Sequence, residues 1–284
     1  MFGIKPTRKA SLKSGVAFAA LLTATLSFGT SAQAGTVVWA NNAGSDLLEK
    51  IDISTGTVLD TIAPIAGHSG NGRGVAVVGN VVYFSNANDG RIFKVDATTH
   101  ADLGVFVDTG FGGNGVATVA FDGTNFYATG YTGNNNTNVY DMNGNFVRTF
   151  SGLGNGRDGF EVANNHIVAN RGDLTGPYDL YDLNAVLITP SFLVDPNTTQ
   201  TTGVTFDGTD YYVAQVFGNA IDIFDSAGNY IRSQAIPGSH LFEDLSALGN
   251  VPNNPPPGVP EPATLSILGI GLAALGLARR RKSA

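Results

Sequence analysis

VVYFSN (Val81–Asn86) and VVWANN (Val37–Asn42) match residue for residue in type, although 44 positions separate them along the chain. Both segments are runs of β-branched and aromatic residues that end in polar side chains, which is typical of a β-strand followed by a turn. Related runs recur at Phe126–Ala128 and at Tyr211–Val213. A strand pattern that recurs through the chain indicates a repeat architecture.

Another strand pattern precedes these runs at a nearly constant period. It occurs, with spacings of 44, 41, 44 and 41 residues, at Val75–Val77, Val119–Phe121, Phe160–Val162, Val204–Phe206 and Leu245–Ala247. In the units that are complete along the chain a third strand follows, as at Ala220–Asp225, and then a fourth, as at Asn145–Phe150. Four short strands in each repeat are typical of a β-propeller blade, and residues 35–250 contain no good amphipathic helix pattern. The sequence therefore predicts an all-β, five-bladed β-propeller.

The fifth unit is incomplete at its C-terminal end, where only Asp244–Asn250 precedes a proline-rich stretch. Its missing strands are found at the other end of the fold, at Val37–Asn42, Leu47–Ile53 and Thr57–Ile62. We therefore expect the C-terminal strand to pair with the N-terminal strands and close the ring, which removes exposed sheet edges. In the period of its strand pattern, the repeat resembles the broad family of YVTN/NHL-like and lactonase-like propellers.

The first 34 residues have the organisation of a secretory signal peptide. Four basic residues lie between Lys5 and Lys13, and an apolar stretch follows at Val16–Phe28. Ala32 and Ala34 then supply a small-x-small cleavage pattern, so we expect cleavage after Ala34. No twin-arginine pair precedes the apolar stretch, which favours the Sec export machinery. The alternative is an amphipathic start to a cytosolic domain.

The C-terminal region has three parts in a specific order after a proline-rich spacer at residues 251–259. Residues 260–284 contain Pro260-Glu261-Pro262, the apolar run Ala263–Ala278 and a basic cluster formed by Arg279, Arg280, Arg281 and Lys282. This order resembles the PEP-CTERM sorting signal. The resemblance implies that exosortase, a membrane-embedded processing enzyme of Gram-negative bacteria that make exopolysaccharide, recognises Pro260, Glu261 and Pro262.

The apolar run predicts one short transmembrane helix. Its 16 residues would span about 24 Å as a helix, against a hydrocarbon core of about 30 Å, so flanking residues must help it to cross. The basic cluster after the run favours the cytoplasmic side, which places residues 35–259 in the periplasm. The alternative is a buried helix of the folded domain, but Pro255–Pro257 separates the run from the fold.

The charge of the mature region excludes one class of partner. Residues 35–259 contain eight basic and 22 acidic side chains, a net charge of −14. An acidic surface repels phosphate backbones, so we expect no nucleic-acid binding. The chain has no cysteine, which excludes thiolate metal sites and cysteine nucleophiles within it.

Candidate binding residues lie in loops that would meet at one face of the ring. The loops that lead into the first strands contain five charged residues: Arg73, Arg157, Asp158, Glu243 and Asp244. The loops that leave the second strands contain Asn86, Asn170, Arg171 and Gln215. Side chains at corresponding positions of several blades would converge on one channel mouth, which we interpret as a binding site. The alternative is that Arg73, Arg157, Asp158 and Asp244 form ion pairs that hold the blades together.

The sequence predicts no catalytic residue, cofactor or metal. Asp158, Glu243 and Asp244 could supply acid and base groups, but adjacent residues on a strand usually point to opposite faces. The four histidines lack the spacing of metal ligands: His68, His100, His166 and His240. Asp141–Asn145 resembles the start of a calcium loop but lacks its later glutamate, and Asn143-Gly144 predicts a hairpin turn instead.

Together these features predict an exported protein that is anchored briefly in the inner membrane and then processed by exosortase. What the PEP-CTERM resemblance implies is a final location at the cell surface or in the polysaccharide matrix of a biofilm. The propeller would act there as a binding or scaffold module for a polysaccharide or a surface protein. The alternative is an extracytoplasmic enzyme of the lactonase or glycosidase type.

Overall fold

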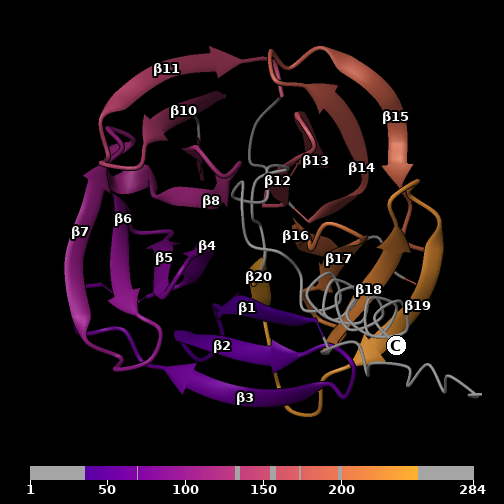
Figure 1. Ribbon diagram of the computed structural model, residues 1–284, viewed down its shortest axis with the longest axis horizontal. Helices are drawn as coiled ribbons and strands as arrows, with labels where there is room; N and C mark the ends of the chain where they lie inside the picture. Colours follow the sequence, from indigo (N-terminus) through magenta and orange to yellow (C-terminus); the bar gives the residue numbers. More distant parts are fainter. Residues whose placement is uncertain are drawn as a thin grey trace, which may run out of the picture. The chain divides into compact units, whose positions relative to one another are not determined.

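The computed structural model describes residues 36–248, apart from residues 69, 132–134, 154–157, 173 and 198–199. Twenty β-strands in this part of the chain form five antiparallel sheets of four strands each. The sheets lie around a common centre as the blades of a propeller (Figure 1). The prediction of an all-β, five-bladed propeller is confirmed.

The first strand of each blade lies nearest the centre of the ring and the fourth lies at the periphery (Figure 1). The first strands are β4 (Gly72–Val78), β8 (Val116–Phe121), β12 (Phe160–Ala163), β16 (Thr201–Phe206) and β20 (Phe242–Ala247). The second strands are β5 (Val81–Asn86), β9 (Asn125–Gly130), β13 (His166–Gly172), β17 (Asp210–Gln215) and β1 (Val37–Asn42). The third strands are β6 (Asp89–Asp96), β10 (Asn136–Asp141), β14 (Thr175–Asp182), β18 (Ala220–Asp225) and β2 (Leu47–Asp52). The fourth strands are β7 (Asp102–Asp108), β11 (Phe146–Ser151), β15 (Leu187–Leu193), β19 (Tyr230–Ala235) and β3 (Thr57–Ile62).

The ring is closed by the pairing of β20 with β1, as the sequence predicts. Their antiparallel register joins Ala40 to Leu245 and Asn41 to Asp244. We call the closed blade β20-β1-β2-β3 blade 1, and blades 2 to 5 begin with β4, β8, β12 and β16. The closing strand begins at Phe242, two residues before its predicted start, because a bulge after Asn41 lets Asn42 pair with Phe242.

Five apolar clusters hold the blades together, one at each junction between neighbouring blades. Between blades 1 and 2, Trp39 and Leu48 pack in one cluster with Val75 and Phe93. Trp39, Leu48 and Phe93 are fully buried. Since burial of one such side chain contributes about 1.5–3 kcal/mol, these clusters supply much of the cohesion of the ring.

An aspartate ends the third strand of every blade and organises the turn that follows. The five aspartates are Asp52, Asp96, Asp141, Asp182 and Asp225. Each carboxylate accepts a hydrogen bond of 2.7–2.9 Å from the backbone N–H two residues later. In blade 3 the turn places Gly144 at φ 81°, a conformation that glycine adopts readily. The predicted hairpin turn at Asn143-Gly144 is therefore confirmed.

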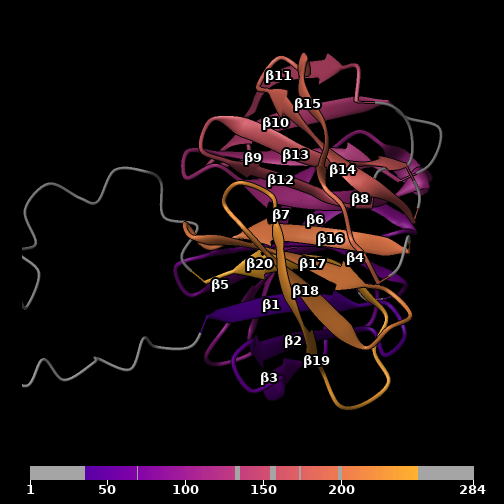
Figure 2. The same cartoon turned by 90° about the vertical axis from the view of Figure 1, so that its right-hand side faces the viewer.

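The strands run between two faces of the ring, as the side view in Figure 2 shows. We call one the Arg73 face; it contains the loops that lead into the first strands, such as 236–241. The opposite Asx-turn face contains the five aspartate turns and the hairpins from first to second strands. Leu248 N donates to Val37 O at 2.9 Å, so both ends of the described domain lie together on the Asx-turn face.

Within the described residues, no helix is long and apolar enough to cross a membrane. The helical segment seen there is η1 (Gly112–Asn114), a short 3-10 turn before β8. The predicted signal peptide at 1–34, with Ala32 and Ala34, lies outside the described residues. So do the spacer at 251–259 and the whole C-terminal signal at 260–284.

Candidate functional site

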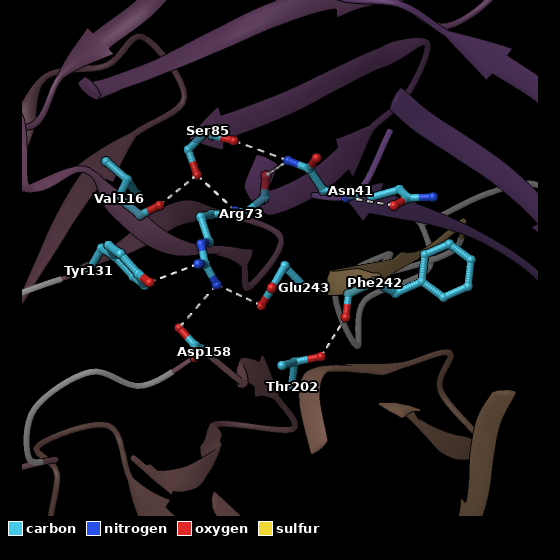
Figure 3. Close-up of polar contacts among 12 residues, drawn as sticks. Asn41, Arg73, Ser85, Val116, Tyr131, Asp158, Thr202, Phe242 and Glu243 are labelled. Atoms are coloured by element: carbon cyan, nitrogen blue, oxygen red, sulfur yellow. Dashed lines mark hydrogen bonds and ion pairs between the residues drawn. The ribbon is translucent and has the colours of Figure 1, made fainter. Parts of the chain in front are cut away.

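One side chain from each blade lies at the same level near the Arg73 face, on a first strand or, in blade 4, two residues before β12. In the repeat these positions are occupied by Arg73, Ala117, Asp158, Thr202 and Glu243. Arg73 and Glu243 lie within β4 and β20, not in the loops predicted from the sequence. Figure 3 shows Arg73, Asp158 and Glu243 directed toward one another. One cationic and two anionic groups thus meet where the blades converge.

Arg73 joins four blades through its guanidinium group. Its Nη1 lies 2.7 Å from Glu243 Oε2 of blade 1 and 3.9 Å from Asp158 Oδ1 of blade 4. Its Nη2 donates to the hydroxyl of Tyr131, in blade 3, at 2.8 Å. The centre of the guanidinium also lies 4.1 Å from the centroid of the Tyr131 ring, within range of a cation–π interaction.

The three charged side chains of this cluster are buried. Arg73 and Glu243 are each 7% exposed, and Asp158 is fully buried. Charges in such a place are costly to desolvate and are retained only when they are paired with good geometry. The arrangement is therefore that of an internal ion-pair centre between blades.

Asp244 fills the centre of the ring at the next level. The corresponding positions of the other blades are held by small side chains: Gly74, Thr118, Gly159 and Gly203. A Cβ atom on Gly203 would lie 2.3 Å from Asp244 Cα. The absence of a side chain at Gly203 therefore lets the backbone of β20 approach β16 closely at Asp244.

The carboxylate of Asp244 accepts backbone hydrogen bonds from three strands. Oδ2 accepts from Val75 N at 2.9 Å and from Val119 N at 3.4 Å, and Oδ1 accepts from Leu245 N at 3.0 Å. Burial raises the pKa of Asp244 well above its ordinary value, although the same hydrogen bonds act in the opposite direction. The last strand thereby contacts blades 2 and 3 across the axis.

Side chains on the first strands satisfy backbone groups that have no strand partner. The inner edge of each first strand faces the axis, where a buried N–H would otherwise lack an acceptor. Ser246 Oγ accepts from Val77 N, and Thr205 Oγ1 accepts from Ala247 N, both at 2.9 Å. Thr205 Oγ1 also donates to Glu161 Oε2 at 2.8 Å. These contacts link blades 2, 1, 5 and 4 in sequence.

A further set of polar contacts joins the blades nearer the Arg73 face (Figure 3). Asn41 Nδ2 donates to Gly74 O at 3.1 Å and to Ser85 O at 3.0 Å. Ser85 Oγ donates in turn to Val116 O at 3.0 Å. Blades 1, 2 and 3 are therefore tied by side chains as well as by apolar packing.

Comparison with solved structures shows likeness in fold. One chain of a crystal structure of a nidogen/laminin complex is similar, with a TM-score of 0.51 and 12% sequence identity. The match covers 75% of this chain and 98% of that chain. No curated protein matches the chain.

Comparison with protein families addresses the tail instead. Residues 258–282 match the PEP-CTERM protein-sorting motif. The chain carries a PEP-CTERM sorting signal. The matched residues include Pro260-Glu261-Pro262 and the basic cluster from Arg279 to Lys282. The PEP-CTERM signal indicates an exported protein that exosortase sorts, with the propeller as its folded domain.

The structure brings together three of the five candidate binding residues of this chain, which carries the PEP-CTERM signal. Arg73, Asp158 and Glu243 are in contact as described above, whereas the carboxylate of Asp244 is directed at backbone N–H groups. Arg157 lies outside the described residues. A role of these residues in ligand binding stays a prediction, and their burial and pairing favour the alternative of ion pairs between blades.

Three of the four candidate residues after the second strands bond to groups outside this cluster, contrary to expectation. Gln215 Nε2 donates to Asp222 Oδ2 at 2.6 Å, and Arg171 pairs with Asp179 at 2.8 Å. Asn86 Nδ2 donates to His68 O at 3.2 Å, and Asn170 is fully buried. Gln215 and Arg171 face the third strand of their own blade, because a strand side chain meets its cross-strand neighbour before it reaches the axis.

Tyr131 was missed by reasoning from the sequence. It lies one residue beyond Gly130, which aligns with Asn86 and Gln215 in the repeat. Extending the same alignment into blade 3 would have pointed to this loop. Its side chain reaches the guanidinium of Arg73 with both its hydroxyl and its ring.

Two histidines fasten loops of the Arg73 face. His68 stacks on Phe93 with ring centroids 4.2 Å apart, and its Nδ1 lies 3.0 Å from Asp102 Oδ1. His240 Nδ1 lies 2.9 Å from Glu49 Oε2. Across the described ranges, no group of three or more histidine and acidic side chains is placed to hold a metal ion.

Proposed function

We propose that the chain is a surface or matrix protein sorted by exosortase, whose propeller acts as a non-catalytic binding or scaffold module. Cleavage after Ala34 would release the signal peptide, and processing at Pro260-Glu261-Pro262 would release the domain from the helix Ala263–Ala278. The functional divisions are then 1–34, 35–250, 251–259 and 260–284. The match of residues 258–282 to the sorting motif supports export and sorting by exosortase. The propeller fold supports a role as a binding or scaffold module.

The main support for a non-catalytic role is that the central carboxylates already form ion pairs or hydrogen bonds within the domain. Hydrolysis of a glycoside requires two carboxyl groups on either side of a bound substrate. Asp158 and Glu243 instead share Arg73 in a buried cluster, and Asp244 accepts backbone hydrogen bonds. These groups stabilise the ring, so binding without turnover is the better-supported function.

The chemistry of the Arg73 face suits a neutral or amino sugar, or a basic protein surface. The mature region carries a net charge of −14, which disfavours anionic ligands. Phe217, in the hairpin between β17 and β18, is 57% exposed on this face. An exposed aromatic ring is a suitable platform for a sugar ring, because it offers an apolar face on which the sugar can stack.

A binding assay tests this role. We expect purified protein to bind glycans or matrix fractions, to release no sugar or lactone product, and to lose at least half of its binding after Phe217→Ala. Phe146→Ala is the matched control, because Phe146 is 61% exposed but lies at the start of β11 near the Asx-turn face. Turnover of a sugar or lactone would contradict the proposal and support the enzymatic alternative.

A fractionation experiment tests the sorting route separately. In a host that carries exosortase, Glu261→Ala should leave full-length protein in the inner membrane, while the spacer variant Pro256→Ala should be processed normally. Normal processing of Glu261→Ala would show that the motif is not the recognition site. Retention of Glu261→Ala with release of Pro256→Ala would support recognition at the Pro-Glu-Pro step.

A further inference from the structure

We infer that the membrane-anchored form holds its Arg73 face away from the lipid surface, and its Asx-turn face toward it. The inference rests on the anchoring proposed above. It would leave the proposed ligand face free to bind before exosortase releases the domain.

Both ends of the described domain lie on the Asx-turn face. β20 and β1 close blade 1 with Leu248 N bonded to Val37 O, at the place where other blades have a first-to-second hairpin. In blade 2 that place is the turn between Val78 and Val81. The segment that leads to the membrane therefore leaves from the Asx-turn face, and it leaves from an inner strand.

The segment that connects the propeller to the proposed membrane segment is short. Fourteen residues, 249–262, separate Leu248 from Ala263, where the proposed membrane segment begins. A proline-rich segment extends by about 3.1 Å per residue, so the connection spans about 43 Å when it is extended in this way. To bring the Arg73 face to the membrane, it would have to pass outward over β1, β2 and β3 and then along a whole strand.

That path uses most of the extended connection and holds it stretched. Three strand spacings of about 4.8 Å and a strand of six residues at about 3.3 Å each sum to about 34 Å, before any loop is crossed. The shorter route through the centre is closed, because Asp244 Oδ2 lies 2.9 Å from Val75 N and 3.4 Å from Val119 N there. With the Asx-turn face toward the membrane, the connection needs no detour.

Attraction to lipid does not set this orientation. The Asx-turn face carries the carboxylates that end the third strands, from Asp52 to Asp225, and these repel anionic headgroups. The tether alone provides the bias, so the orientation should persist at high salt, where exposed charges are screened.

The absence of cysteine from the chain makes the test direct. Ser45→Cys and Thr55→Cys place single labels at opposite ends of β2, both at exposed positions. The full-length chain carrying a fluorophore at either site is reconstituted into vesicles that contain headgroup-quencher lipids. We expect the label at position 55 to be quenched at least twofold more than the label at position 45, at low and at high salt.

Equal quenching, or stronger quenching at position 45, would overturn the inference while leaving the anchor intact. Flotation of the same vesicles separates the two proposals. If the full-length chain does not float with the vesicles, the proposed anchor fails and the inference fails with it. A variant lacking Ala263–Ala278 should stay unbound and give no quenching at either position.

Discussion

Arg73 Nη1 lies 2.7 Å from Glu243 Oε2, and this ion pair joins blade 2 to the strand that closes the ring. Both side chains are buried, and Asp158 and Tyr131 bring blades 4 and 3 to the same guanidinium. The contact therefore connects the C-terminal strand to most of the propeller. Removing these charges from water costs free energy, and the same removal makes the loss of either partner strongly destabilising.

Removal of Arg73 should destabilise the protein strongly. Arg73→Met leaves Glu243 and Asp158 as buried carboxylates without that cation, so we expect a loss of about 3–5 kcal/mol in the free energy of unfolding. Urea unfolding measures the change. Arg91→Met is the matched control, because Arg91 pairs with Asp89 at a more exposed site within one blade and such pairs contribute about 0–1 kcal/mol. Equal losses in both variants would contradict a special role for Arg73.

Tyr131 should contribute through both its hydroxyl and its ring. Tyr131→Phe removes the acceptor for Arg73 Nη2 and should cost about 1.5 kcal/mol, the lower end of the range for a hydrogen bond to a charged group. Tyr131→Ala should cost clearly more, because it also removes the aromatic face beneath the guanidinium. If the two variants unfold at the same urea concentration, the ring contributes nothing.

Acid should weaken the turns of all five blades together. Hydrogen bonds hold the pKa values of Asp52, Asp96, Asp141, Asp182 and Asp225 below the ordinary value of 3.8. A lowered folded pKa gives stability that is present above pH 3.8 and is lost as the pH falls through the folded values. The thermal midpoint should therefore fall steeply below about pH 4. Asp225→Asn should make that fall shallower. A fall of unchanged steepness would show that the turn at Asp225 does not contribute to the acid sensitivity.

Asp244 should have the opposite pH dependence. Its pKa is raised by burial, so the stability that it contributes is fully present below the unfolded pKa and is lost as the pH rises through the folded pKa. As the pH rises from about 4 to 8, wild type should therefore lose unfolding free energy relative to Asp244→Asn. Measurements at both ends of this range test the sign. A difference that grows in favour of wild type would contradict the raised pKa.

Much of the fold could be predicted from sequence because it depends on local pattern. The match between Val37–Asn42 and Val81–Asn86 placed the N-terminal strands in the same role as those of blade 2, and β20 pairs with β1 as that match requires. The start of β20 at Phe242 was missed because a bulge after Asn41 shifts the register. A bulge has no clear signal in the spacing of residues.

The candidate site was harder to predict because its contacts cross between blades. The repeat predicted that Arg73, Asp158 and Glu243 would converge together with Arg157 and Asp244, and in the structure Arg73 pairs with both Asp158 and Glu243. It could not say which side chains bend back into their own blade, as Gln215 does, or which reach the centre, as Tyr131 does. Reach depends on the length of the side chain and on the nearest partner of opposite polarity.

Internal deletion of residues 242–248, with the tail retained, tests most directly whether the propeller is a ring closed by its last strand. The deletion removes Glu243, Asp244 and every pairing between β20 and β1. The account predicts that cooperative thermal unfolding is lost and that protease cuts the domain at β1 and β4 under conditions in which wild type resists. A deletion variant that unfolds at the wild-type temperature and resists protease equally would contradict closure by β20.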